Sequence, residues 1–330
     1  MTRMQRSRHF RPALPMLALA LALATLTGQA RDPAGRTSKP IVETPASGVV
    51  GIGEAQLSPD FWVTRAPSPD QPLMERAAID ARNARLSQAD DSMLDLAALP
   101  GVLSREQVGG WIEGLASPPA KPLWDEAGTP VAKATLDAIV SNRAMAAIPA
   151  SQPTRFGMAV ERAALRAFPT LLRVFSSVGD TDIDRFQESA LFPGDPVAIV
   201  HASADAQWLF VVSPRYAAWV EAKAIAQGDR GSVLAYGART PYRVVTGAKP
   251  RTVFTLEEPR LSELQLDMGT RVPLANAAPD RPVNGQHPYS SWILDLPVRN
   301  PDGSLAFAPA LLPKIADSAA DYLPLTRANL

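Results

Sequence analysis

The sequence predicts a mainly β protein in which a helical N-terminal domain precedes two small β-barrels in tandem. Three observations predict this fold class. The chain holds 32 prolines in 330 residues, helical periodicity is seen before residue 150, and short apolar runs separated by turns follow it. Proline lacks an N–H and fixes φ, so helix interiors and central strands exclude it. We therefore expect short elements and many turns instead of a long helical bundle.

The first 30 residues have the pattern of a signal peptide. Four arginines precede an apolar run, Met16–Leu26, and the small residues Gly28 and Ala30 fit a cleavage site after Ala30. The run is shorter than the roughly 20 residues that span a bilayer. We expect an exported, soluble protein of the periplasm or cell envelope with no membrane span after cleavage. The alternative is an uncleaved N-terminal anchor. A lipoprotein is excluded because the sequence has no cysteine.

Residues 31–57 are rich in Pro, Gly, Ser and Thr without a period, which predicts a flexible linker. Residues 58–150 are expected to be a helical domain. Ser104 and Gln107 form a capping-box pattern that opens a helix running to Leu115. The segments Leu73–Leu86 and Val131–Val140 predict two further helices.

Short β-type runs begin at about residue 155. Pro196–Ala202, Gln207–Val212 and Ala217–Ala222 are three such runs within about 30 residues, and Asp, Ser and Pro punctuate them. Tight turns between short strands predict a small antiparallel barrel over 151–228.

The pattern resumes after Gly228 and predicts a second barrel over 229–330. The segment Asn300–Gly303 is a strong hairpin turn, with proline at its second position and glycine at its fourth. The candidate strands are Tyr242–Thr246, Thr252–Leu256, Gly269–Leu274, Trp292–Val298 and Ser304–Pro309.

Several spaced motifs carry a resemblance to a known family. They are Leu165–Thr170, Asp182–Ser189, Gly194–Val197, His201–Ser203, Gln207–Ser213 and Tyr216–Val220. Together they resemble the first bacterial SH3-like domain of NlpC/p60-type peptidoglycan endopeptidases. The part from Phe61 to Trp111 is similar to the N-terminal stabilising domain of these enzymes. The part from Met268 to Asn329 looks like their second SH3-like domain and the exit toward the catalytic domain.

The resemblance implies cell-wall binding and scaffolding through peptidoglycan stem peptides. In the family, a papain-like domain follows and cuts the γ-D-glutamyl–diaminopimelate bond with a cysteine nucleophile. Thiolate attack requires a cysteine, and this chain has none. We therefore expect no enzyme activity from this chain itself. One alternative is that it is the front portion of an active cysteine endopeptidase whose catalytic domain lies beyond Leu330. Another is a periplasmic protein whose barrels bind a protein partner.

Six residues are candidates for ligand binding. Trp208 could line an aromatic groove, although core packing is the favoured interpretation; for Tyr216 and Trp219 both interpretations stay open. An alternating acidic segment lacks the glycine and glutamate of a calcium loop, so it predicts a turn whose Asp side chains accept backbone N–H bonds. It could also form a groove rim that accepts the amine of a stem peptide. Its candidates are Asp182, Asp184 and Gln187.

The sequence predicts no catalytic residues, no metal site and no cofactor. His201 and His287 are the only histidines after residue 30, too few for a zinc or triad site, and His201 is interpreted as a hydrogen-bonded structural residue. Without its first 30 residues the chain carries a net charge of −4, so a basic face for nucleic acid is not expected. The remaining expected partner is a catalytic cysteine peptidase domain.

Overall fold

A computed structural model describes residues 48–90, 93–278, 280–316 and 318–321. The predicted signal peptide and the first part of the predicted linker lie outside these residues, as does the segment after Asp321. Contacts divide the chain after Leu57, and Ser58 begins the second, larger unit. In the first unit the structure describes a single 3₁₀ turn, η1 (Glu54–Leu57). None of the described helices has the length and apolar character needed to cross a bilayer.

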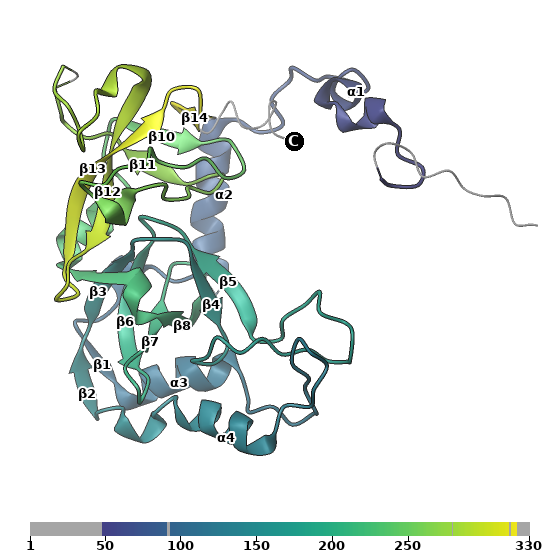
Figure 1. Cartoon of the computed structure of the whole chain (residues 1–330), viewed down its shortest axis with the longest axis vertical. Helices are drawn as coiled ribbons and strands as arrows, with labels where there is room; N and C mark the ends of the chain where they lie inside the picture. The colour runs from purple at the N-terminus through teal and green to yellow at the C-terminus, as the bar shows by residue number, and fades with distance from the viewer. Residues whose placement is uncertain (1–47, 91–92, 279, 317, 322–330) are drawn as a thin grey trace, which may run out of the picture. The chain divides into compact units, whose positions relative to one another are not determined.

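The capping box correctly predicts where the helix Arg105–Leu115 begins. The Ser104 hydroxyl accepts a hydrogen bond from Gln107 N at 3.2 Å, and the Gln107 side chain accepts one from Ser104 N at 3.0 Å. This helix, α3, buries Val108 and Ile112 against the seven-stranded sheet described below, and Figure 1 shows it next to that sheet. The helices of this part are α1 (Pro59–Val63), α2 (Arg76–Ala89), α3 (Arg105–Leu115) and α4 (Lys133–Ser141), with 3₁₀ turns η2 (Leu96–Ala98) and η3 (Met145–Ala147).

Helix α2 confirms the predicted helix but starts three residues later, after Glu75. Its surroundings differ from those of a core helix. Leu73 and Leu86, which the periodicity places near one face, are exposed, and Ile79 is half-buried. Alanines and arginines dominate α2, so its apolar face is too weak to hold it in the core.

A seven-stranded antiparallel sheet forms the centre of the larger unit (Figure 1). The predicted runs are confirmed as three consecutive strands joined by hairpins, β6, β7 and β8. The spatial order is β5-β4-β8-β7-β6-β3-β9. The strands are β3 (Arg155–Ala159), β4 (Ala163–Arg166), β5 (Gln187–Leu191), β6 (Pro196–Ala202), β7 (Trp208–Val212), β8 (Ala217–Glu221) and β9 (Ile225–Gly228).

The segment just before β3 pairs with the helical part instead of the sheet. Strand β2 (Ser151–Pro153) lies antiparallel to β1 (Val102–Ser104), the strand that leads into α3. This short ladder therefore ties the predicted helical region to the start of the sheet.

The second β region contains a three-stranded sheet and a long hairpin. The predicted turn is confirmed: Gly303 N donates to Asn300 O at 2.8 Å, and Gly303 takes a φ of +87° that suits glycine. The sheet order is β11-β10-β14. The strands are β10 (Tyr242–Val245), β11 (Arg271–Pro273) and β14 (Ser318–Ala319), and the hairpin joins β12 (Ser291–Arg299) to β13 (Leu305–Pro313).

The predicted strand Thr252–Leu256 is wrong. Its N–H groups have partners in separate places, since Thr252 N donates to Leu264 O, Val253 N to Leu311 O and Thr255 N to the Ser262 hydroxyl. Alternating apolar residues gave the strand pattern, but no single neighbouring strand offers a ladder of acceptors here.

The two β regions pack directly against each other. Helix α5 (Arg230–Tyr236) follows β9 directly, and its Tyr236 ring stacks on Phe307 of the hairpin at 5.3 Å between centroids. Gln227 N donates to Gly303 O at 2.9 Å, and Arg299 Nε donates to Ile225 O at 3.0 Å. The predicted boundary at residue 228 therefore runs through continuous packing.

The coarse expectation of a mainly β protein is confirmed. The pairing leaves β5 and β9 as the outer strands of the seven-stranded sheet. Closed barrels in tandem and a separate helical domain stay predictions.

Candidate functional site

The six predicted ligand residues do not form one site. The structure places Trp219 in the core, Asp182, Asp184 and Gln187 around one small cavity, and Trp208 and Tyr216 at two other cavities.

Trp219 cannot line a groove, which corrects that candidate. It lies on the inner strand β8 and is 0% exposed. Its ring packs edge-on against Phe210 at 5.3 Å and against His201 at 6.1 Å between centroids. The Trp219 indole nitrogen is buried without a hydrogen-bond partner among the described residues. The area that the ring buries explains its position.

Asp184 is also corrected, because its carboxylate is a buried structural group. One oxygen accepts from Arg166 Nη1 at 2.5 Å, and the two side chains are only 7% and 5% exposed. The other oxygen accepts from Val174 N and Phe186 N at 3.2 and 3.0 Å. This is the pattern that the turn interpretation predicts. Asp184 therefore holds the long loop between β4 and β5.

Gln187 and Asp182 flank this ion pair. The Gln187 amide donates to Ser189 O at 2.6 Å, so it is engaged within the protein. Asp182 is exposed and lines a cavity of about 400 Å³ beside Arg166 and Arg173. Of the two aspartates, Asp184 is buried and Asp182 is exposed, so Asp182 is the one whose carboxylate faces solvent.

Tyr216 lies at a second cavity, of about 510 Å³, between the β7–β8 turn and the β5–β6 connection. The Ser213 hydroxyl fixes the turn by accepting from Tyr216 N at 3.0 Å and donating to Tyr216 O at 2.8 Å. The phenol is half-buried and donates to Glu188 Oε2 at 2.5 Å. This hydrogen bond, together with burial, raises the pKa of Tyr216 to about 12.

The carboxylate of Asp195 lines the same cavity. Burial raises the pKa of Asp195, although its carboxylate accepts from Phe192 N at 2.9 Å and faces the positive charge of Arg215. Glu188, on the edge strand β5, is exposed. The lining thus carries the Asp195 carboxylate and the Arg215 cation, and the exposed Glu188 carboxylate on the Tyr216 phenol is an acceptor that can hold an ammonium group.

Sequence reasoning missed Glu188 and Asp195. Glu188 lies next to the candidate Gln187, where the pairing of β4 with β5 shifts register, and a local pattern does not encode which residue of such an irregularity reaches Tyr216. Its partner Tyr216 is 28 residues away, and no local pattern joins the two.

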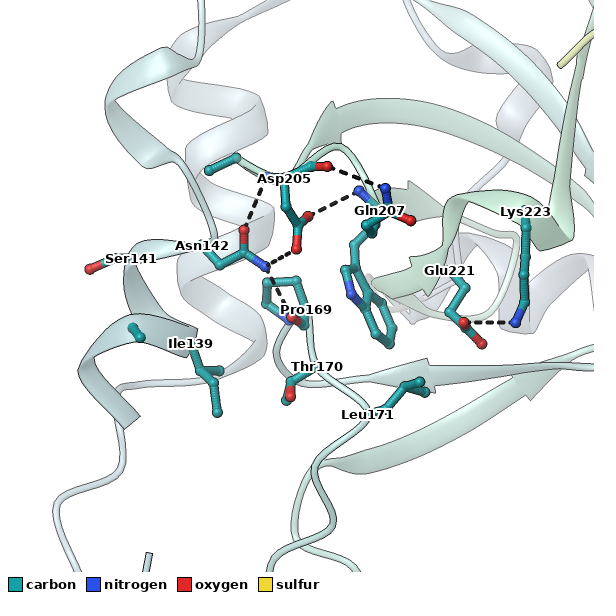
Figure 2. A pocket seen from close by; sticks show the side chains of 13 residues that line it. Ile139, Ser141, Asn142, Pro169, Thr170, Leu171, Asp205, Gln207, Glu221 and Lys223 are labelled. Carbon is teal, nitrogen blue, oxygen red and sulfur yellow. Dashed lines mark hydrogen bonds and ion pairs between the residues drawn. The ribbon is translucent and has the colours of Figure 1, made fainter. Parts of the chain in front are cut away.

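A third cavity, of about 790 Å³, adjoins Trp208. Figure 2 shows this cavity with other residues of its lining, among them Asn142, Asp205 and Gln207. Trp208 is 6% exposed, so most of its ring is core and one part reaches this cavity. His201 is buried on β6 and its Nε2 lies 3.0 Å from Arg143 O, as expected for a structural histidine; burial lowers its pKa. Within the described ranges, no group of three or more His, Asp or Glu could hold a metal ion.

Comparisons with known proteins agree with this fold. An SH3 domain of the SH3b1 type matches residues 173–221, which include β5 to β8. The structure is similar to an NlpC/P60 endopeptidase from Photobacterium damselae subsp. piscicida, with a TM-score of 0.56 and 16% identity. The similarity covers 76% of this chain and 54% of the endopeptidase, so the chain spans about half the length of that protein. No curated protein matches the sequence. The resemblance to the SH3-like N-terminal part of an NlpC/p60-type protein is confirmed.

Proposed function

We propose that this chain is a non-catalytic module that binds peptidoglycan stem peptides and acts as a scaffold in the bacterial cell envelope. The cavity beside Tyr216, built on the SH3 domain, is the observation that carries the proposal. The signal-peptide pattern supports export to the periplasm or envelope. The SH3 match and the second β region support two SH3-like barrels in tandem.

The charges at the cavity favour a ligand that carries an amine. Glu188 is exposed and accepts a hydrogen bond from Tyr216 of the lining, and Asp195 belongs to the lining, where it faces Arg215. An ammonium group can replace the phenol as a hydrogen-bond donor to Glu188 and pack on the ring. A stem peptide has free amines of this kind.

Hydrolysis by a thiolate would need a cysteine from outside these 330 residues. The similar protein is an endopeptidase of which this chain matches about half. This observation favours a second candidate function: the chain is the front portion of an active γ-D-glutamyl–diaminopimelate endopeptidase, and its partner is the catalytic domain. An Asp-Cys-Ser element in the coding sequence beyond codon 330 would support it, and a stop codon there would remove it.

Co-sedimentation with purified sacculi tests wall binding directly. We expect the wild-type chain to sediment with sacculi, and Glu188→Gln to reduce the bound fraction because the carboxylate loses its charge. Glu106→Gln is the matched control, since Glu106 is exposed on the first turn of α3 and lines none of the three cavities.

A wild-type chain that stays in the supernatant would show that the proposal is wrong. Binding that Glu188→Gln and Glu106→Gln leave equally unchanged would place the wall contact away from Tyr216. Stable capture of another envelope protein, with no affinity for stem peptide, would favour a protein-binding role instead.

A further inference from the structure

The cavity beside Trp208 is the largest of the cavities described above and lies apart from the Tyr216 site. Figure 2 shows its walls, which come from the C-terminal end of α4, the loop after β4, and the β6–β7 turn. Its volume of about 790 Å³ falls within the range of roughly 300–1,000 Å³ of small-molecule sites. The cavity can therefore hold a small oligomer.

Hydrogen bonds hold one wall rigidly. The Asn142 amide donates to Asp205 Oδ2 at 3.1 Å and to Pro169 O at 3.2 Å, and its oxygen accepts from Asp205 N at 3.3 Å. Asn142 thus joins three segments that are distant in the sequence (Figure 2). A wall fixed in this way is preorganised for a ligand.

The charged groups at the cavity already have partners within the protein. Both oxygens of Asp205 accept hydrogen bonds, from Asn142 on one side and from Ser203 and Gln207 N on the other. On the opposite wall, Lys223 Nζ lies 2.9 Å from Glu221 Oε1. Asp205 keeps its negative charge because its donors are all neutral, and Lys223 is paired with Glu221, so the arrangement disfavours an anionic ligand. Both oxygens of Asp205 are already engaged, which leaves neutral polar groups as the contacts available to a ligand.

Polar groups that can donate and accept remain available. The Ser141 hydroxyl has no partner among the described residues, and the Gln207 amide makes one long contact of 3.5 Å, to Asp205 O. The Trp208 indole N–H donates to no described residue and is not fully buried, so a ligand can reach it. Trp208 thus offers an accessible N–H and an apolar ring edge together.

The fold disfavours a peptide in this cavity. An added strand needs a sheet edge, but the edges are β5 and β9, whereas β7 and β8 line the cavity. A proline-rich segment needs several aromatic residues, and Trp208 is the only aromatic residue of the lining. Apolar patches from Ile139 and Leu171 alternate with amide and hydroxyl groups instead.

We propose that this cavity binds an uncharged oligosaccharide, such as a segment of an N-acetylated glycan strand. A sugar ring presents an apolar C–H face together with hydroxyl and amide groups, which matches the apolar and polar groups of the lining. The inference rests on the cavity itself and not on stem-peptide binding at Tyr216.

Titration of the ¹⁵N-labelled full chain with N-acetylchitotetraose tests the proposal by NMR. The chain has six tryptophans, and Trp208→Phe identifies the Trp208 indole signal by its loss. We expect this signal to shift saturably. Gln207→Ala should lower the association constant roughly three- to tenfold, the loss expected for one hydrogen bond. Gln71→Ala is the matched control, because Gln71 is exposed and lines none of the cavities described above.

An unmoved Trp208 signal, or an affinity that Gln207→Ala leaves unchanged, overturns the proposal. So does a shift that a neutral proline-containing peptide produces and the sugar does not. If Trp208→Phe does not fold, the comparison of wild type, Gln207→Ala and Gln71→Ala still decides, because any signals that shift saturably give the association constants and Gln207 is exposed. Glu188→Gln should leave sugar binding unchanged, so failure here and failure of stem-peptide binding are distinguishable.

Discussion

Asp184→Ala should destabilise the protein strongly, because it leaves a buried cation without its partner. Arg166 is 4% exposed, and its remaining hydrogen bonds go to neutral acceptors, the carbonyls of Thr170 and Leu172 and the amide oxygen of Gln187. The substitution also removes the acceptor of two backbone N–H groups, those of Val174 and Phe186. A ligand-binding aspartate would have none of these structural consequences.

The expected cost follows from the burial of both partners. Removing one partner of a buried ion pair costs about 3–5 kcal/mol of unfolding free energy. For a unit of this size, 1 kcal/mol shifts the melting temperature by about 2–4 °C, so we expect a fall of about 6–20 °C. Replacing both partners, as in Arg166→Met with Asp184→Leu, should recover part of this loss because no charge stays buried.

Urea unfolding and calorimetry of the full chain measure these effects. The matched control is Asp182→Ala, two residues away, which is exposed and should change stability by no more than about 0.5 kcal/mol. If Asp184→Ala costs less than about 1 kcal/mol, or no more than Asp182→Ala, the structural role assigned to this ion pair is refuted.

Three further changes test the Tyr216 cavity and the sheet. Glu188→Gln should lower the pKa of Tyr216 from about 12 toward 10 in a spectrophotometric titration, because the hydrogen bond favours the protonated phenol in the folded state. The stabilisation by this hydrogen bond is present below pH ~10 and is lost as the pH rises through about 12. Because burial raises the pKa of Asp195, its penalty applies once the carboxylate ionises, and Asp195→Asn should stabilise the protein more at pH 7 than at pH 3 in urea titrations. Gly157→Ala should cost about 1–3 kcal/mol, since its Cβ would lie 2.9 Å from a backbone oxygen of the adjacent strand, whereas Gly110→Ala, in open space on α3, should gain about 0.5–1 kcal/mol in the same unfolding assay.

Each of these expectations has a result that would contradict it. A Tyr216 pKa unchanged by Glu188→Gln would show that the hydrogen bond does not set it. An effect of Asp195→Asn that is equal at both pH values would mean that burial of the carboxylate carries no penalty. A Gly157→Ala variant as stable as Gly110→Ala would contradict the tight packing between β3 and its neighbouring strands.

Local patterns predicted local structure well. The capping box at Ser104, the hairpin turn at Asn300–Gly303 and the strand Pro196–Ala202 need only neighbouring residues, and all three are confirmed. The strand predicted at Thr252–Leu256 is wrong because strand formation depends on a partner that the segment itself does not encode.

For the candidate sites, too, local sequence patterns do not identify partners that are distant in the sequence. Alternating aspartates correctly predicted a turn, but the partner that buries Asp184 is Arg166, 18 residues earlier. Burial likewise separated Trp219 from Tyr216, although the two lie three positions apart in one motif. Residue type identified groups capable of chemistry, whereas exposure, which depends on the whole fold, decided which of them can meet a ligand.

The stacking of Tyr236 on Phe307 determines whether the SH3-matched segment, residues 173–221, can be moved into another protein by itself. A fragment that ends at Gly228 would lack helix α5 and the β12–β13 hairpin, which cover part of its hydrophobic core. The apolar side chains on that face of the sheet would then be exposed to water. Anyone grafting this segment onto another protein should carry α5 and the β12–β13 hairpin with it. The two β regions would then be transferred together as one unit and not as two independent domains.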